Sequence, residues 1–241
     1  MKTMESIPDI VGFLKKTFKK QNKSKAVIAV SGGIDSAVAL TLLAKSLGVE
    51  SIYPLFLPYG DQSIKDSVQI AKWNKIPEQN WRTINIKPVV DLLSTTLNAS
   101  QIRRGNIMAR TRMICVFDTA KELDALVCGT ENKSEHYLGY FTRFGDAASD
   151  IEPISTLYKT QVRMAAVDLG IPEVFLTKAP SAGLWENQTD EGEMGFTYED
   201  ADRALAVLLG ESTEEVDQNL LKKVDTVVKA QEFKRMVPYS L

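Results

Sequence analysis

KAVIAVSGGIDSAVALTLLAKSL, residues 25–47, is the stretch that decides the fold. Its first part, 26–30, is apolar and partly β-branched, which is typical of a buried central strand. The serine and glycines at 31–33 interrupt this pattern, and Asp35 opens an apolar run of helical period that continues to Leu47. A strand, a glycine turn and a helix start together present backbone N–H groups and the positive end of a helix dipole. The stretch therefore predicts a phosphate-binding loop.

The spacing within this loop separates the known kinds of phosphate site. A Walker A loop needs GxxxxGK[ST], but Lys45 lies too far along the helix. A dinucleotide fingerprint needs GxGxxG, whereas these glycines are adjacent and end at Gly33. The pattern that remains, SGGIDS, resembles the pyrophosphatase loop of the N-type ATP pyrophosphatases, which holds the β- and γ-phosphates while the α-phosphorus is attacked. The alternative is an ordinary strand-to-helix turn with serine and aspartate caps.

The length and composition fit one α/β domain. A chain of 241 residues can bury a sizeable core. Its 29 Lys and Arg against 31 Asp and Glu give a net charge of -2, which predicts no general affinity for nucleic acid or membrane. We find no apolar run of transmembrane length and no apolar signal-peptide region at the N-terminus. Cys115 and Cys128 lack CxxC spacing, so we expect reduced core thiols in a cytoplasmic protein.

Strand and helix patterns alternate along the chain. The expected strands are 26–30, 51–57, 82–86 and 125–128. The expected helices are 7–19, 35–47, 62–75, 88–97, 105–122, 160–169, 198–209 and 213–233. The stretch 129–159 shows no clear period. This order predicts a doubly wound parallel sheet covered on both faces, with ligands at the carboxyl ends of the strands.

Candidate binding residues follow several of these elements. The loop 57–63 would receive an adenine, or would simply form a tight turn that caps the next helix. Four arginines lie within 103–112 of a slightly acidic chain, which favours anion recognition over a solvated helix face. After the fourth strand, Thr130 offers a hydroxyl for a phosphate or ribose. Glu135 is placed to share a magnesium ion with Asp35.

Five blocks, taken together, give a more specific resemblance. They are SGGIDSA (31–37), GNIMARTRM (105–113), GTENKSE (129–135), GYFTRFGDAASDIEP (139–153) and PSAGLWENQTDEGEMGFTY (180–198). In this order they resemble the ammonia-dependent NAD synthetases, and they span most of the chain. The resemblance implies a Rossmann-like adenine nucleotide alpha hydrolase fold, a single domain over 1–241 without a glutaminase domain, and a homodimer.

The resemblance also implies a C–N ligase chemistry in two steps, the last of NAD biosynthesis. The carboxylate of deamido-NAD attacks the α-phosphorus of ATP, which gives an adenylated intermediate and pyrophosphate. Ammonia then displaces AMP and leaves NAD. Mg²⁺ is the implied cofactor and ATP the co-substrate. Such a reaction needs no nucleophile on the protein, because positioning and electrostatic stabilisation supply most of the rate enhancement.

Individual roles follow from the same resemblance. The implied ATP contacts are Ala29, Val30, Ser31, Gly32, Gly33, Ile34, Asp35, Ser36, Thr130, Lys159 and Ser181. Asp35 and Glu135 would hold magnesium, and Asp35 and Lys159 would be catalytic. The implied deamido-NAD contacts are Arg110, Arg143, Asp150, Phe233 and Lys234. Many members have lysine where Arg143 stands and histidine where Phe233 stands, so the substrate pose is expected to differ there.

Three other classes share part of the pattern. A tRNA thiolase or other sulfur-transfer enzyme also begins from SGGxDS but needs a reactive cysteine, for which Cys128 at a strand end is the candidate. The amidating subunit of a GMP or asparagine synthetase lacks the blocks 139–153 and 180–198. A nucleotide sensor would bind ATP without releasing pyrophosphate. Glycines in the block 180–198 predict a segment that closes over the substrate and excludes water.

Overall fold

The fold is centred on a parallel sheet. The computed structural model describes residues 6–181, 183–185 and 188–236. Its sheet has the strand order β3-β2-β1-β4, with β1 (Ala26–Ala29), β2 (Ile52–Phe56), β3 (Arg82–Thr83) and β4 (Leu126–Cys128). All pairs are parallel, and β1 lies between β2 and β4. The phosphate loop therefore leaves from the middle of the sheet.

The predicted strands are confirmed, with two changes at the edges. β3 has two residues, although the backbone N–H groups of Ile84 and Ile86 still donate to the carbonyls of Phe56 and Pro58. At the other edge, Ile151 forms an isolated parallel bridge to Cys128. The stretch that showed no period thus contributes a short extension beside β4.

The described part of the chain contains twelve α-helices. They are α1 (Ile7–Lys20), α2 (Ile34–Leu47), α3 (Lys65–Trp73), α4 (Lys87–Thr96), α5 (Gln101–Leu123), α6 (Lys133–Leu138), α7 (Lys159–Asp168), α8 (Glu173–Thr177), α9 (Asp190–Met194), α10 (Tyr198–Leu208), α11 (Gln218–Ala230) and α12 (Glu232–Arg235). Single 3₁₀ turns occur at Val49–Ser51 and Glu78–Asn80. The expected helices are present, but the last one is divided into α11 and α12. The helices α6, α8 and α9 were not predicted, because so few residues show no periodicity.

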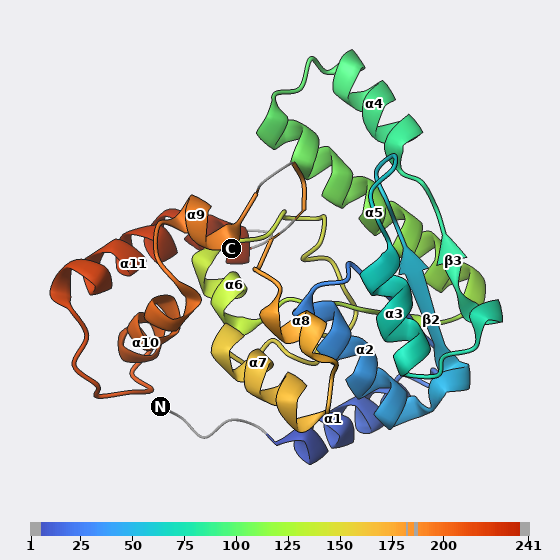
Figure 1. Cartoon of the computed structure of the whole chain (residues 1–241), viewed down its shortest axis with the longest axis horizontal. Helices are drawn as coiled ribbons and strands as arrows, with labels where there is room; N and C mark the ends of the chain where they lie inside the picture. The colour runs from blue at the N-terminus through green and yellow to red at the C-terminus, as the bar shows by residue number, and fades with distance from the viewer. Residues whose placement is uncertain (1–5, 182, 186–187, 237–241) are drawn as a thin grey trace, which may run out of the picture.

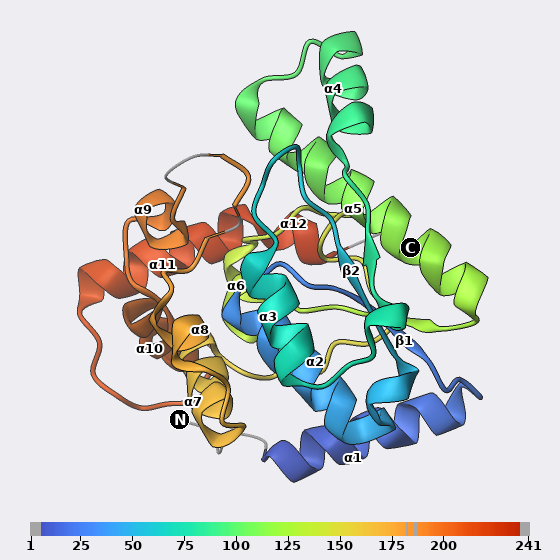
Figure 2. The ribbon, with the colours of Figure 1, turned by 45° about the vertical axis from the view of Figure 1, so that its right-hand side comes forward.

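Alternate residues of the strands enter two separate cores. Ile28 and Ile52 pack with α1, α2, α3, α7 and α8. Val27 and Leu55 pack with α4 and α5 on the opposite face. This period of two is the signature of a sheet that is buried on both sides. Figures 1 and 2 show α2 and α3 on one side of the strands and α5 on the other, which confirms the doubly wound arrangement.

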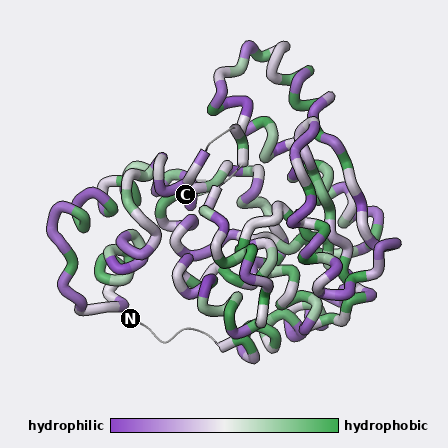
Figure 3. The backbone as a smooth tube through the Cα atoms, viewed as in Figure 1, coloured by the Kyte–Doolittle hydropathy of each residue, from purple (hydrophilic) through white to green (hydrophobic). Residues whose placement is uncertain are grey.

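A third core lies beside the sheet, between α6, α10 and α11. Its members include Tyr158, Tyr198 and Leu205, all at most 2% exposed. Figure 1 shows α10 and α11 forming a lobe next to α7. Hydrophilic positions alternate with hydrophobic ones along the outer helices α4 and α11, as Figure 3 shows. Among the described residues, no helix has the length and apolar character needed to cross a membrane.

Candidate functional site

The phosphate loop is shaped by its first glycine and its two serines. Gly32 has φ +78°, and a Cβ there would lie 2.9 Å from the Cβ of Asp66, so only glycine fits. The Ser36 hydroxyl donates to the Gly33 carbonyl at 3.0 Å and lies 3.1 Å from Ser31 Oγ. Helix α2 begins at Gly33 without a side-chain cap. Its first N–H groups therefore face the loop, as an anion site requires.

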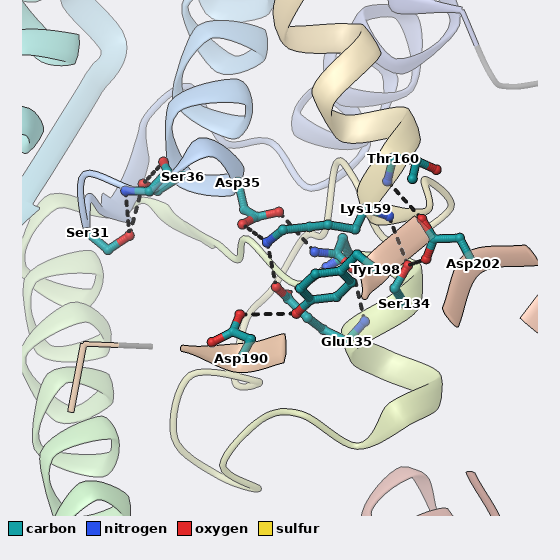
Figure 4. A network of polar contacts seen from close by, with 12 residues as sticks. Ser31, Asp35, Ser36, Ser134, Glu135, Lys159, Thr160, Asp190, Tyr198 and Asp202 are labelled. Carbon is teal, nitrogen blue, oxygen red and sulfur yellow. Dashed lines mark hydrogen bonds and ion pairs between the residues drawn. The ribbon is translucent and has the colours of Figure 1, made fainter. Parts of the chain in front are cut away.

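A buried lysine joins two carboxylates beside this loop (Figure 4). Lys159 Nζ lies 2.6 Å from Asp35 Oδ2 and 3.0 Å from Glu135 Oε1. The Lys159 side chain is 3% exposed. The amide of Asn132 donates to the second Asp35 oxygen at 2.9 Å. The first turns of α2, α6 and α7 thus meet at one cluster, where the segments after β1 and β4 come together.

The charges in this cluster depend on one another. Burial disfavours a charge on Lys159, but attraction to Asp35 and Glu135 outweighs it and raises the pKa of the ammonium. Burial raises the pKa of Glu135, with Asp35 repulsion adding to it and Lys159 opposing it. Two neighbouring carboxylates at a site of this kind need a cation between them. Lys159 is that cation.

The same two carboxylates fit a magnesium ion. Because Asp35 and Glu135 both reach one ammonium, their carboxylates lie close enough together for each to offer an oxygen to a hard cation beside Lys159. Within residues 6–181, 183–185 and 188–236, no group of three or more His, Cys, Asp or Glu side chains forms a metal cluster. A donor set of two carboxylates suits Mg²⁺ that takes its remaining ligands from water and nucleotide phosphates.

Lys159 is held in place by residues that the sequence did not single out. Asp202 of α10, 1% exposed, accepts a hydrogen bond from the Thr160 N–H at 2.8 Å and another from the Ser134 hydroxyl. Ser134 Oγ in turn accepts from the Lys159 N–H at 2.8 Å. The Lys159 ammonium lies 5.0 Å from the ring centre of Tyr198. The third core therefore fixes the start of α7 and the direction of this lysine.

The block 180–198 docks on the cluster through α9. The Tyr198 hydroxyl donates to Asp190 Oδ2 at 3.1 Å (Figure 4), and the Tyr140 hydroxyl donates to Glu193 at 2.8 Å. Asp190 is 3% exposed. This helix thus connects the loop 139–146 with the cluster. The predicted closing motion of the block stays a prediction.

A second lysine, Lys178, borders the phosphate loop, and the sequence did not single it out. Lys178 Nζ donates to the Gly32 carbonyl at 3.2 Å and pairs with Asp66 at 2.6 Å. Nearby, exposed Ser181 accepts from the Gly183 N–H at 3.1 Å. Lys178 has no motif around it, so only the packing of the segment after α8 reveals its place.

The loop 57–63 lies against the arginine block. Arg112 donates to the Leu57 carbonyl and to Gln62 Oε1, both at 3.1 Å, so this arginine points toward the loop after β2. Gln62 donates in turn to the Gly183 carbonyl at 3.1 Å. A cavity of about 1070 Å³ lies among these segments; its lining includes Tyr59, Arg104, Met108, Leu184 and Trp185. The loop therefore has room for a base beside it, and its adenine contact stays a prediction.

Three of the predicted dinucleotide contacts form one cluster. Arg110 donates to the carbonyl of Arg143 at 3.2 and 3.3 Å. Arg143 donates from Nη1 to the carbonyl of Phe233 at 3.3 Å. These contacts join α5, the loop 139–146 and α12.

The other two predicted dinucleotide contacts are engaged with backbone. Lys234 donates to the carbonyls of Gly139 and Phe141 at 2.6 and 3.0 Å, and burial lowers the pKa of its ammonium. Asp150 accepts from the Val127 N–H at 2.8 Å, at the edge strand β4. Lys234 thus lies beside the arginine cluster, whereas Asp150 lies at the sheet.

A small acidic cavity borders the Lys159 cluster at Glu135. Its volume is about 40 Å³, and its lining is Thr130, Glu131, Glu135, Tyr140, Phe141 and Asp146. The cavity is large enough for one water molecule or a cation of that size.

The remaining predicted ATP contacts lie at the end of β1 and at the start of α2; they are Ala29, Val30 and Ile34.

The cysteines argue against sulfur transfer. Both Cys115 and Cys128 are free thiols. Burial, with a smaller effect of Glu152, raises the pKa of Cys128 well above its usual range. A thiolate is the reactive species, so this cysteine is poorly suited to be a nucleophile.

A carboxyl group below Gly129 gives a prediction for stability. Glu152 accepts from the Ser149 hydroxyl at 2.7 Å and from the Glu131 N–H at 3.1 Å, and burial raises its pKa to about 8. The native state therefore binds this proton more tightly than the unfolded state does. The stability that Glu152 contributes is complete below its unfolded pKa and is lost as the pH rises towards 8.

The Glu152→Gln variant should therefore depend less on pH than wild type. From pH 5 to pH 8, its free energy of unfolding should fall less than that of wild type, by on the order of 2 kcal/mol, as measured by denaturant unfolding. Parallel pH profiles would rule this out.

Known proteins resemble the chain over nearly its whole length. The NAD synthase family model matches residues 6–238. The NH(3)-dependent NAD(+) synthetase of Fusobacterium nucleatum is 44% identical over 241 residues, covering 95% of this chain and 92% of that protein. The NH(3)-dependent NAD(+) synthetase of Thermoplasma acidophilum is 40% identical, and the match covers 99% of this chain and 98% of that protein. The solved structure of an NMN synthetase from Francisella tularensis is 34% identical with a TM-score of 0.87, covering 98% and 96%. The chain therefore belongs to the NAD synthase family.

Proposed function

We propose that the protein amidates deamido-NAD to NAD with ammonia and ATP, through an adenylated intermediate, and releases AMP and pyrophosphate. The observation that carries the proposal is the meeting of Lys159 with Asp35 and Glu135 beside the uncapped start of α2. Relatives of 40% and 44% identity are named NH(3)-dependent NAD(+) synthetases, which agrees with it.

Each part of the site has a distinct task in this reaction. The loop N–H groups hold the phosphates, and Lys159 stabilises negative charge that develops on them. Asp35 and Glu135 would hold Mg²⁺, which when bound neutralises phosphate charge. Arg110 and Arg143 attract the acidic substrate, so two anions are held together despite their repulsion. The block 180–198 borders the site and limits the access of water to the reactive acyl-adenylate.

The acidic cavity is the proposed place of the nitrogen donor. Its lining combines the carboxylates of Glu131, Glu135 and Asp146 with aromatic rings, a combination that attracts a small cation such as ammonium. Asp146→Asn should raise the KM for ammonium by roughly three- to tenfold and leave the KM for ATP within twofold. Initial rates at varied ammonium concentration measure this. An unchanged ammonium KM would exclude Asp146 from the donor site.

A second candidate is the amidation of the mononucleotide. The Francisella protein of TM-score 0.87 is described as an NMN synthetase. The same carboxylate-to-amide step on nicotinate mononucleotide would give that product. Comparing kcat/KM for the mononucleotide and the dinucleotide acceptor decides between them, because the enzyme should favour its own substrate by at least tenfold.

We further propose a homodimer that functions in the cytoplasm. The helices α4 and α5 project from the body (Figure 1), and they and the C-cap of α4 carry exposed apolar side chains; these are Leu92, Leu97, Ile102 and Ile114, each more than half exposed. Apolar side chains gathered on projecting helices suit an interface between copies. Sedimentation equilibrium should give twice the chain mass of 26.7 kDa, and a monomer at micromolar concentration would contradict this.

Turnover by purified protein tests the main proposal. With ATP, MgCl₂, deamido-NAD and ammonium chloride, chromatography should detect NAD, AMP and pyrophosphate in equal amounts. Glutamine in place of ammonium should serve poorly. A reaction that yields neither NAD nor AMP with either acceptor would refute the proposal.

A further inference from the structure

Two phenylalanine rings flank the guanidinium group of Arg143. The guanidinium carbon lies 5.1 Å from the ring centre of Phe144 and 5.9 Å from that of Phe233. Both distances are within the range of cation–π attraction. Nη1 also donates to the Phe233 carbonyl at 3.3 Å. The side chain is therefore held by contacts from two segments that are 89 residues apart in the chain.

The backbone conformation of Phe144 is unusual for such a residue. Its φ is +59°, in the left-handed region, and its side chain is 54% exposed. The positive φ falls on Phe144 and not on the neighbouring glycine, Gly145. A Cβ at Gly145 would come within 3.0 to 3.1 Å of Thr142 and Ala109, so a larger residue would not fit there without a shift. A bulky exposed residue in this region is kept by something other than core packing, and such outliers gather at binding sites.

We propose that Phe144 and Phe233 are positioning residues that present Arg143 to the anionic part of deamido-NAD. A guanidinium held against aromatic rings can still donate to a carboxylate or phosphate through the N–H groups that do not contact the Phe233 carbonyl. Arg110 fixes the carbonyl of the same residue, so the backbone is held as well. The rings act through Arg143 and need no contact with the substrate. This inference rests on the proposed function, since it names the substrate of that site.

The experiment is a double-mutant cycle on the acceptor KM. Phe144→Leu and Phe233→Leu keep an apolar side chain but remove the π face, so each should raise the KM for deamido-NAD by about two- to fivefold. The kcat and the KM for ATP should stay within 1.5-fold of wild type. Phe233→Trp keeps an aromatic ring, so this variant should keep the wild-type KM for deamido-NAD. In an Arg143→Met background, Phe233→Leu should have no further effect, because its partner is already gone.

The controls separate this role from a structural one. Phe13→Leu on α1, where the side chain is 48% exposed, should leave every constant unchanged. Thermal unfolding should show all variants folded at the assay temperature. If the Leu variants leave the KM unchanged, or raise it equally in the Arg143→Met background, the inference is wrong although the proposed function stands. A wild-type protein that fails to convert deamido-NAD would refute the proposed function and this inference together.

Discussion

Replacing Lys159 with methionine is expected to lower kcat by roughly two to three orders of magnitude. The Lys159 ammonium joins Asp35 Oδ2 to Glu135 Oε1, at 2.6 and 3.0 Å. Without it, the charge that stabilises the phosphates is lost and the two carboxylates repel each other. Steady-state kinetics at saturating substrates measure the loss.

A partly buried lysine, Lys133, provides the matched control. Lys133, with a side chain 13% exposed, pairs with Glu211 at 2.6 Å on the lobe side of α6. Lys133→Met should cost stability but keep kcat within about threefold, since it breaks a mostly buried pair outside the site. Thermal unfolding distinguishes the two effects. A Lys159→Met protein that is folded and turns over within threefold of wild type would remove this lysine from catalysis.

Asp35→Asn is expected to lower kcat by roughly 10²-fold while the Kd for deamido-NAD changes by less than about twofold. The residue lies at the first turn of α2, and its carboxylate contacts Lys159 and Asn132. Under the proposed function this carboxylate acts on the metal and the nucleotide and not on the acceptor. Asparagine keeps the shape but removes the charge that a hard cation requires.

The magnesium dependence gives the readout for this role. The Mg²⁺ concentration at half-maximal rate should rise in Asp35→Asn, and calorimetry should give the Kd for deamido-NAD. Asp217→Asn, which alters the N-cap of α11, is the control because it lies outside the site. Equal losses in turnover and in acceptor binding would contradict the assigned role.

The sequence predicts the sheet and its central loop for a physical reason. The apolar strand of residues 26–30 and the glycine turn after it are local features, and local features survive in the sequence pattern. Helix α6 lay hidden in the stretch 129–159 because its signal is a capping box between Asn132 and Glu135, and six residues carry no period.

The contacts within the site are less visible in the sequence because they are long-range. Lys159 and Asp35 are 124 positions apart, and only the packing of α7 on α2 brings them together. Asp202 and Ser134, which fix the start of α7, stand 68 positions apart on helices of the third core. The family resemblance supplied Lys159 but not these supports. No periodic pattern marks a buried aspartate that accepts hydrogen bonds from the first turn of another helix.

The most direct test of the central claim follows oxygen from the acceptor to AMP. Deamido-NAD labelled with ¹⁸O in its carboxylate is incubated with the protein, ATP, MgCl₂ and ammonium chloride, and AMP is analysed by mass spectrometry. An adenylated carboxylate predicts that one ¹⁸O passes to the phosphate of AMP for each NAD formed. NAD formation with unlabelled AMP, or with ADP in place of AMP, would contradict the account.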